Sequence, residues 1–314
     1  MTVQEEAPHF GEPGVQSTVE GQTEKAAAEV RTPFLSRHRW LKRLLHDKGA
    51  VFGGSVMLFL VVVAFAAPLL TPADPMWMDP LNRLRPPSRA HPFGTDSSGR
   101  DIFSMVIYGA RISLIVGLSV MIFSSLAGVV IGLLSGFFKT LDNIIMRIND
   151  GMMAFPSILL AIAMMAVLGP RVSNIVIALG VVYTPRMARI IRSVTLSCRA
   201  ITYVEAATAL GVRDLVIAFR HILPNCVPPM IVQGTFVFAF SVLDESSLSF
   251  LGVGAPPYIP SWGNVISMGR LLMIEAPWIS LFPGFAILIT VLALNLLGDG
   301  LRDSLDPRMQ KMNQ

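Results

Sequence analysis

Six apolar runs recur along the 314-residue chain, and each is roughly as long as a lipid bilayer is thick. A helix rises about 1.5 Å per residue, so roughly 20 apolar residues cross a hydrocarbon core about 30 Å thick. We therefore predict an all-α, polytopic membrane protein with six transmembrane helices. The predicted spans cover residues 50–70, 112–138, 148–168, 172–187, 227–251 and 281–297. Pro156 interrupts the third span, and an even number of spans places both chain ends on one side.

The composition argues against a soluble protein. Hydrophobic residues make up 53% of the chain and charged residues only 15%, whereas a soluble surface of this size carries more charge. The formal net charge is +4, but the basic residues are spread over short segments, which disfavours a nucleic-acid-binding face. Cys198 and Cys226 have no Cys or His at metal-ligand spacing. We interpret both as structural thiols and expect no metal site.

The chain divides into four predicted parts. Residues 1–30 are polar and acidic, and we expect them to form a disordered cytoplasmic tail. Residues 31–110 hold a basic segment, the first span and an external loop. Residues 111–308 form a five-helix core with a cytoplasmic loop at 199–225, and residues 309–314 form a second cytoplasmic tail.

The distribution of Lys and Arg predicts the orientation. Of 25 such residues, 18 fall in the terminal segments, in the second and fourth loops or, for Arg186, at the adjoining end of the fourth span, and 7 fall elsewhere. Cytoplasmic loops carry the excess of positive charge, so both termini and the loop at 199–225 are expected to face the cytoplasm.

That long loop has the pattern of a helix, a turn and a second helix. Residues 203–210 contain three alanines and neither Gly nor Pro, which favours a helix. Gly211 permits a turn with positive φ, and Asp214 suits the first turn of a new helix. We expect Pro224 to end the second helix. The loop therefore predicts a pair of short helices along the membrane surface.

The same loop carries a spaced motif: Glu-Ala-Ala, three residues, Gly, a gap, and Leu-Pro. The matching residues are Glu205, Ala206, Ala207, Gly211, Leu223 and Pro224. In this respect the loop resembles the EAA loop of ABC importer permeases, and His221 stands where the peptide-importer branch usually has it. The resemblance implies a coupling element that fits into a cleft of a separate ATPase subunit. The alternative is an ordinary amphipathic loop helix.

Other segments resemble the same family in the same order. HPFGTDSSGRDIFSMVIYGARISLIVG is similar to the segment between the first two spans of the C-type permease in dipeptide, oligopeptide and nickel importers. The matching residues are Gly94, Thr95, Asp96, Gly99, Arg100, Asp101, Gly109, Arg111 and Ser113. Met105 departs from the pattern, since Arg is common there. The resemblance covers residues 50–308.

The resemblance implies a type I ABC importer permease fold in the inner membrane of a bacterium. The implied partners are a related B-type permease, two ATPase subunits or one fused ATPase, and an external substrate-binding protein. The chain has no G-x-x-x-x-G-K-[ST] loop, so we expect ATP and Mg²⁺ to bind the partner ATPases. We expect neither enzymatic activity nor a cofactor in this chain.

Three polar residues lie within the fifth predicted span: Asp244, Glu245 and Ser246. Carboxylates in lipid are costly and are usually turned toward protein or water. Glu245 holds a place where the family has Glu, whereas Asp244 and Ser246 depart from the pattern. We hypothesise that this segment faces the translocation path or the partner permease, where Asp244 would bind a substrate amine; the alternative is a buried contact with an Arg of either permease. For Asp150, at the start of the third span, we predict an ion pair with Arg147 or a neighbouring basic residue.

The solute remains open between di- or oligopeptides, nickel, haem and other small molecules. A secondary transporter or channel is an alternative from another class, but it requires its own ion-coupling residues and often inverted repeats, and no clear repeat is present. A membrane scaffold is a third alternative.

Overall fold

The computed structural model describes residues 39–71 and 74–305. The chain divides into two units, Met1–Trp40 and Leu41–Gln314, and nearly all described residues belong to the second. The predicted tails at 1–30 and 309–314 lie outside the described residues.

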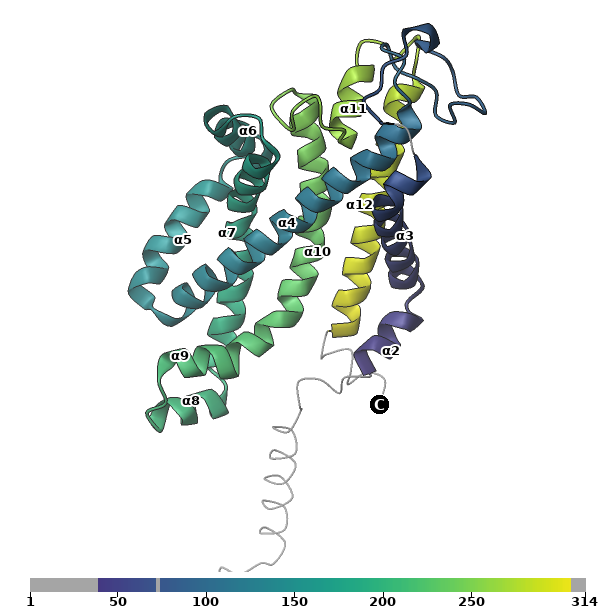
Figure 1. Cartoon of the computed structure of the whole chain (residues 1–314). Coiled ribbons are helices and arrows are strands. Elements are labelled where there is room, and N and C mark those ends of the chain that lie inside the picture. The colour runs from purple at the N-terminus through teal and green to yellow at the C-terminus, as the bar shows by residue number, and fades with distance from the viewer. Residues whose placement is uncertain (1–38, 72–73, 306–314) are drawn as a thin grey trace, which may run out of the picture. The chain divides into compact units, whose positions relative to one another are not determined.

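The described part of the chain is helical (Figure 1). Its helices are α2 (Arg39–His46), α3 (Lys48–Leu70), α4 (Ile102–Phe137), α5 (Lys139–Met153), α6 (Ser157–Leu168), α7 (Val172–Arg199), α8 (Thr202–Ala209), α9 (Asp214–Val216), α10 (Leu223–Phe250), α11 (Trp262–Gly269) and α12 (Trp278–Leu305), with a 3₁₀ turn η1 (Pro80–Asn82) and a π-helical turn η2 (Ile217–Ile222). Across these residues the extended backbone pairs only at the isolated bridge between Thr95 and Asp101. The all-α prediction is confirmed.

Five helices are long and apolar enough to cross a membrane, and the number is six if the bent pair α5–α6 forms one span. The predicted third span over 148–168 is interrupted at Pro156 as expected, but its first part starts earlier than predicted. Helices α5 and α6 meet at an angle of 95°, and α5 already begins at Lys139. Pro156 has no N–H to continue the helix and disfavours helical geometry in the residue before it, so the chain turns there.

Several helices extend beyond the predicted spans. Helix α4 begins at Ile102 rather than at residue 112, because Asp101 caps it by accepting hydrogen bonds from the Ser104 backbone N–H and hydroxyl, both at 2.8 Å. Helix α7 continues unbroken past Pro185 to Arg199. The segment between the fifth and sixth predicted spans contains α11.

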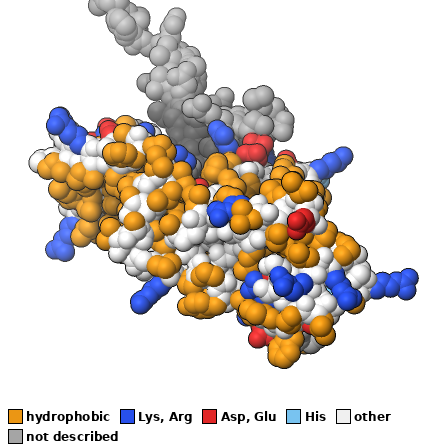
Figure 2. All heavy atoms as spheres, turned by 90° about the horizontal axis from the view of Figure 1, so that it is seen from above, with side chains coloured by type: hydrophobic (Ala, Val, Ile, Leu, Met, Phe, Trp, Pro, Cys, Tyr) orange, Lys and Arg blue, Asp and Glu red, His pale blue; other side chains and the backbone are white. Residues whose placement is uncertain are grey.

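The surface between the helix ends is apolar, as expected for contact with lipid. The side chains of Phe65 and Leu69 on α3 are 80% and 87% exposed, and that of Val167 on α6 is 88% exposed. Seen from above in Figure 2, the molecule also carries hydrophobic side chains over much of the visible face, with basic side chains at several separate places. A water-facing surface would not carry so many large apolar groups.

The unit has two distinct ends. At the loop end, which carries residues 199–225, a Cβ on Gly300 of α12 would meet Ala50 of α3. The Arg199 guanidinium there donates to the Gly136 carbonyl of α4 at 2.9 Å. At the opposite α11 end, Trp262 Nε1 donates to the Val106 carbonyl of α4 at 2.9 Å. The start of α3 and the end of α12 therefore share the loop end.

A stripe of glycines brings α4 and α7 together. Gly128, Gly132 and Gly136 lie four residues apart on α4, and a Cβ on any of them would overlap α7. At Gly132 it would stand 2.6 Å from Ile191 Cβ and 2.7 Å from the Ala188 carbonyl oxygen. Small residues allow such close helix approach in lipid, so these glycines set the distance between α4 and α7.

Ion pairs hold α5 against α7. The Arg192 guanidinium donates to both Asp142 carboxylate oxygens, at 2.5 and 2.6 Å, and Arg189 donates to Asp150 at 2.6 Å. The predicted ion pair of Asp150 exists, but its partner is Arg189 on α7 and not Arg147. The two-pronged geometry at Arg192 fixes both distance and orientation.

Gly132→Ala is expected to lower stability by about 1–3 kcal/mol, because the added methyl overlaps both backbone and side chain of α7. The control is Gly151→Ala on α5, where a Cβ meets nothing within 4 Å. There the helix-favouring methyl is expected to leave stability unchanged or to raise it by up to about 1 kcal/mol. Thermal unfolding of the purified protein in detergent measures both variants. Equal stability of the two would contradict the close α4–α7 packing.

Candidate functional site

The loop between α7 and α10 folds as predicted up to its second helix. Helix α8 follows the alanine-rich segment, and Gly211 takes a φ of 78°. The Gly211 N–H donates to the Thr208 carbonyl at 3.0 Å, and the Val212 N–H donates to the Ala207 carbonyl at 3.1 Å. This pattern satisfies carbonyls at the end of α8 and is typical of a helix closed by glycine. The helix–turn–helix prediction is confirmed to this point.

The prediction that Pro224 ends the second helix was wrong. Helix α9 begins at Asp214, passes into η2 and then into α10, where Pro224 lies in the first turn. Proline is tolerated there because a first-turn N–H has no partner within the helix. The chain from Asp214 to Phe250 is consequently a continuous helical segment, so the loop is joined directly to a span.

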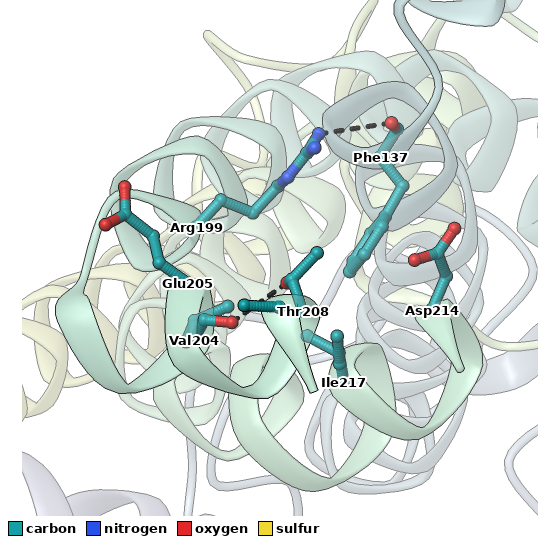
Figure 3. A pocket seen from close by; sticks show the side chains of 8 residues that line it. Phe137, Arg199, Val204, Glu205, Thr208, Asp214 and Ile217 are labelled. Carbon is teal, nitrogen blue, oxygen red and sulfur yellow. Dashed lines mark hydrogen bonds between the residues drawn. The ribbon is translucent and has the colours of Figure 1, made fainter. Parts of the chain in front are cut away.

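A cavity of about 470 Å³ lies between this loop and the ends of α4 and α7. Its lining residues are Phe137, Arg199, Val204, Glu205, Thr208, Ala209, Asp214 and Ile217. Figure 3 shows the carboxylates of Glu205 and Asp214 on opposite sides of the cavity. Arg199 donates to the Phe137 carbonyl at 3.1 Å and lies 5.3 Å from the centre of that ring. The cavity thus has a fixed cation on its α4 side and two exposed carboxylates from the loop.

The six predicted motif residues lie in two places. Glu205, Ala206 and Gly211 are exposed and Ala207 is half-buried, and all four lie on or just after α8. Leu223 and Pro224 are half-buried at the start of α10. Of the six, Glu205 lines the cavity.

Tyr203 connects these two places. Its hydroxyl donates to the His221 carbonyl at 3.4 Å and accepts from Asn225 Nδ2 at 3.5 Å. Asn225 also donates to the His221 carbonyl at 2.7 Å. Helix α8 is therefore tied to the first turn of α10 as well as to its own flanking chain.

Glu245 is fully buried near the α11 end, where hydroxyl groups surround it. Ser249 donates to its Oε1 at 2.9 Å, and Ser113 of α4 donates to its Oε2 at 3.1 Å. Ser246 donates to the same Oε2 at 3.4 Å and to the Val242 carbonyl at 2.8 Å. No Arg or Lys pairs with Glu245 among residues 39–71 and 74–305. The carboxylate therefore links α4 to α10 through hydroxyl donors alone.

Asp244 has a different environment, because it is only half-buried and its hydrogen-bond donor comes from α7. The Tyr183 hydroxyl donates to Asp244 Oδ2 at 2.6 Å. Sequence reasoning missed Tyr183, since a tyrosine within an apolar run gives no signal of its partner. Asp244 and Glu245 are adjacent, so their side chains point in different directions around α10.

Two family models match the sequence. The family described as binding-protein-dependent transport system inner membrane component matches residues 128–311. The N-terminal TM domain of oligopeptide transport permease C matches residues 37–87. The first match covers α7, α8 and α10, and so the whole loop with its motif.

Curated relatives match nearly the full chain. A putative peptide transport system permease protein of Brucella abortus is 46% identical over 269 residues, which is 86% of this chain and 91% of the relative. A dipeptide transport system permease protein of Alkalihalophilus pseudofirmus is 44% identical, over 86% of this chain and 89% of its own. A glutathione transport system permease protein of Escherichia coli is 44% identical, over 90% and 93%. The fold, the loop motif and these matches together show that the chain belongs to the family of inner-membrane components of binding-protein-dependent transport systems.

Proposed function

We propose that this chain is the permease subunit of an ATP-driven importer of short peptides. The exposed helical loop at one end of a membrane bundle supports this most directly, because a permease without a nucleotide site needs a surface that receives motion from an ATPase. The relatives named above transport peptides, dipeptides or glutathione by their names, and none of the three is named for nickel or haem. Family membership also disfavours a secondary transporter or channel.

The contacts of the loop suggest how motion would pass from an ATPase to the spans. A force on α8 reaches α10 through Tyr203 and the continuous helix that begins at Asp214. The same force reaches the end of α4 through Arg199, the last residue of α7, which donates to a carbonyl of α4. Because the loop is a set of linked helices and not a flexible strand, displacement of α8 would move three spans together.

The negative charge of the loop determines which groups an ATPase surface needs in order to bind it. Glu205 is exposed in the first turn of α8, and the exposed Asp214 lies across the cavity from it. A basic side chain or backbone N–H groups on the partner would complement these carboxylates. Exposed Ala206 presents only a methyl group, which permits close approach of another backbone.

The remaining parts of the assembly are proposed on family resemblance and charge. They are a related B-type permease, two ATPase subunits or one fused ATPase, and an external substrate-binding protein. The excess of Lys and Arg at the loop end supports a cytoplasmic location for the loop and both termini. The α11 end would then face the binding protein.

Glu205→Arg is expected to reduce co-purification of the ATPase at least about tenfold, because it replaces an attraction of the kind that contributes about 1.5–3 kcal/mol with a repulsion. The matched control is Glu275→Arg, which makes the same charge change at an exposed position between α11 and α12. The control is expected to retain the ATPase. If Glu205→Arg retains full association and uptake, the loop is not the coupling surface.

Gly211→Val is expected to weaken coupling, because a β-branched residue at a φ of 78° strains the turn between α8 and α9. Gly211→Asn is the control, since Asn tolerates this conformation better. A Cβ meets nothing within 4 Å here, so any difference reflects backbone conformation and not crowding. The measurement is ATP hydrolysis per peptide transported by the reconstituted complex. Equal ratios for both variants would exclude a role for the turn.

A further inference from the structure

A polar cluster lies inside the bundle where α7, α10 and α6 meet. Tyr183 of α7 is buried and donates to Asp244 Oδ2, and the other Asp244 oxygen has no hydrogen bond within the described part of the chain. The side chain of Ser157, the first residue of α6, lies beside the Tyr183 hydroxyl. Arg186, one turn after Tyr183, is close enough for its charge to act on both Tyr183 and Asp244. The cluster therefore combines an anion, a cation and hydroxyl groups.

Arg186 differs from the other arginines of α7. Arg189 and Arg192 are held by carboxylates of α5, and Arg199 is held by carbonyls of α4. Arg186 is exposed and makes no hydrogen bond or ion pair in residues 39–71 and 74–305. It therefore does not reach Asp244 within 4.0 Å, and both charges remain available to a ligand.

The two charged residues of the cluster lie within long apolar helices. Arg186 is 14 residues from Val172 and 13 from Arg199, or about 20 Å from either end of α7. Asp244 is six residues, or about 9 Å, from the end of α10. Ionisable side chains within membrane-spanning helices are costly in lipid and usually serve a pathway or a subunit contact.

The break between α5 and α6 lies next to this cluster. Ser157 follows Pro156, at which the pair bends by 95°. Interrupted helices are common where membrane transporters bind their solutes, because the irregular backbone is tolerated only beside protein or water. Opposite charges and a broken helix therefore coincide at one place.

We propose that Asp244 and Arg186 form a recognition site for the two charged ends of a short peptide during its passage. This inference rests on the proposed function and names its substrate contact. Asp244, oriented by Tyr183, accepts hydrogen bonds from the ammonium group through its free oxygen. Arg186 donates to the terminal carboxylate, for which its planar guanidinium is suited. The proposed contacts involve only the two termini of the peptide and none of its side chains, so peptides of varied sequence are accepted.

The experiment measures uptake of tri-alanine by proteoliposomes that contain both permeases, the ATPases and the binding protein. Asp244→Asn and Arg186→Gln are each expected to lower uptake at least about tenfold, the loss expected for one charge-assisted contact. Asp244→Glu keeps the charge and is expected to retain more uptake than Asp244→Asn. Asp150→Asn is the control, because it removes an exposed carboxylate of α5 that pairs with Arg189. That control is expected to keep uptake within about twofold, as is usual for an exposed pair.

Measurements of complex assembly and of ATP hydrolysis distinguish a loss of peptide recognition from a loss of assembly or coupling. The inference requires that both neutral variants assemble fully and hydrolyse ATP when the binding protein is added. Unchanged uptake in either variant would overturn it, as would an equal loss in Asp150→Asn. Loss of the second permease from the purified complex would instead assign these residues to the contact between permeases. Absence of peptide uptake by the wild-type complex would refute the proposed function itself.

Discussion

Three glycines on one face of α4 allow α7 to approach until Met187, Ile191 and Thr195 occupy the space where their Cβ atoms would stand. In lipid, this close contact replaces the hydrophobic drive that assembles soluble helices. Helix α7 carries the arginines that hold α5, and its end begins the exposed loop. The positions of α5 and of the loop therefore depend on how closely α4 and α7 pack.

The contacts at the loop end join its helices to the ends of three spans. Helix α8 is joined through the Gly211 turn to a helical segment that continues without a break into a span, and Tyr203 ties it to the same span. Arg199 fastens the other side to carbonyls of α4. A cavity lined by Glu205 and Asp214 lies among these fixed points. Such a surface suits a partner that pushes or pulls, as the proposed coupling to an ATPase requires.

Two adjacent carboxylates on α10 illustrate how the environment separates structural from functional roles. Glu245 is fully buried and receives hydrogen bonds from three serines, one of them on α4, so it has little capacity for a further ligand. Asp244 receives one bond from Tyr183, and within the described part of the chain its other oxygen has no donor and the nearby Arg186 has no ion pair. Burial with complete hydrogen bonding favours a structural role, whereas partial satisfaction near an opposite charge favours binding.

The sequence alone determined the helical class, most span positions, the loop motif and the Gly211 turn, because apolar length and local backbone preference are properties of neighbouring residues. It did not predict the 95° bend after α5, the continuation of the helix through Pro224, or the partner of Asp150. It also gave no sign that Tyr183 meets Asp244, which lies 61 residues later. Only tertiary structure decides these features, because they depend on which helix faces lie together, and helix packing is not encoded by local spacing.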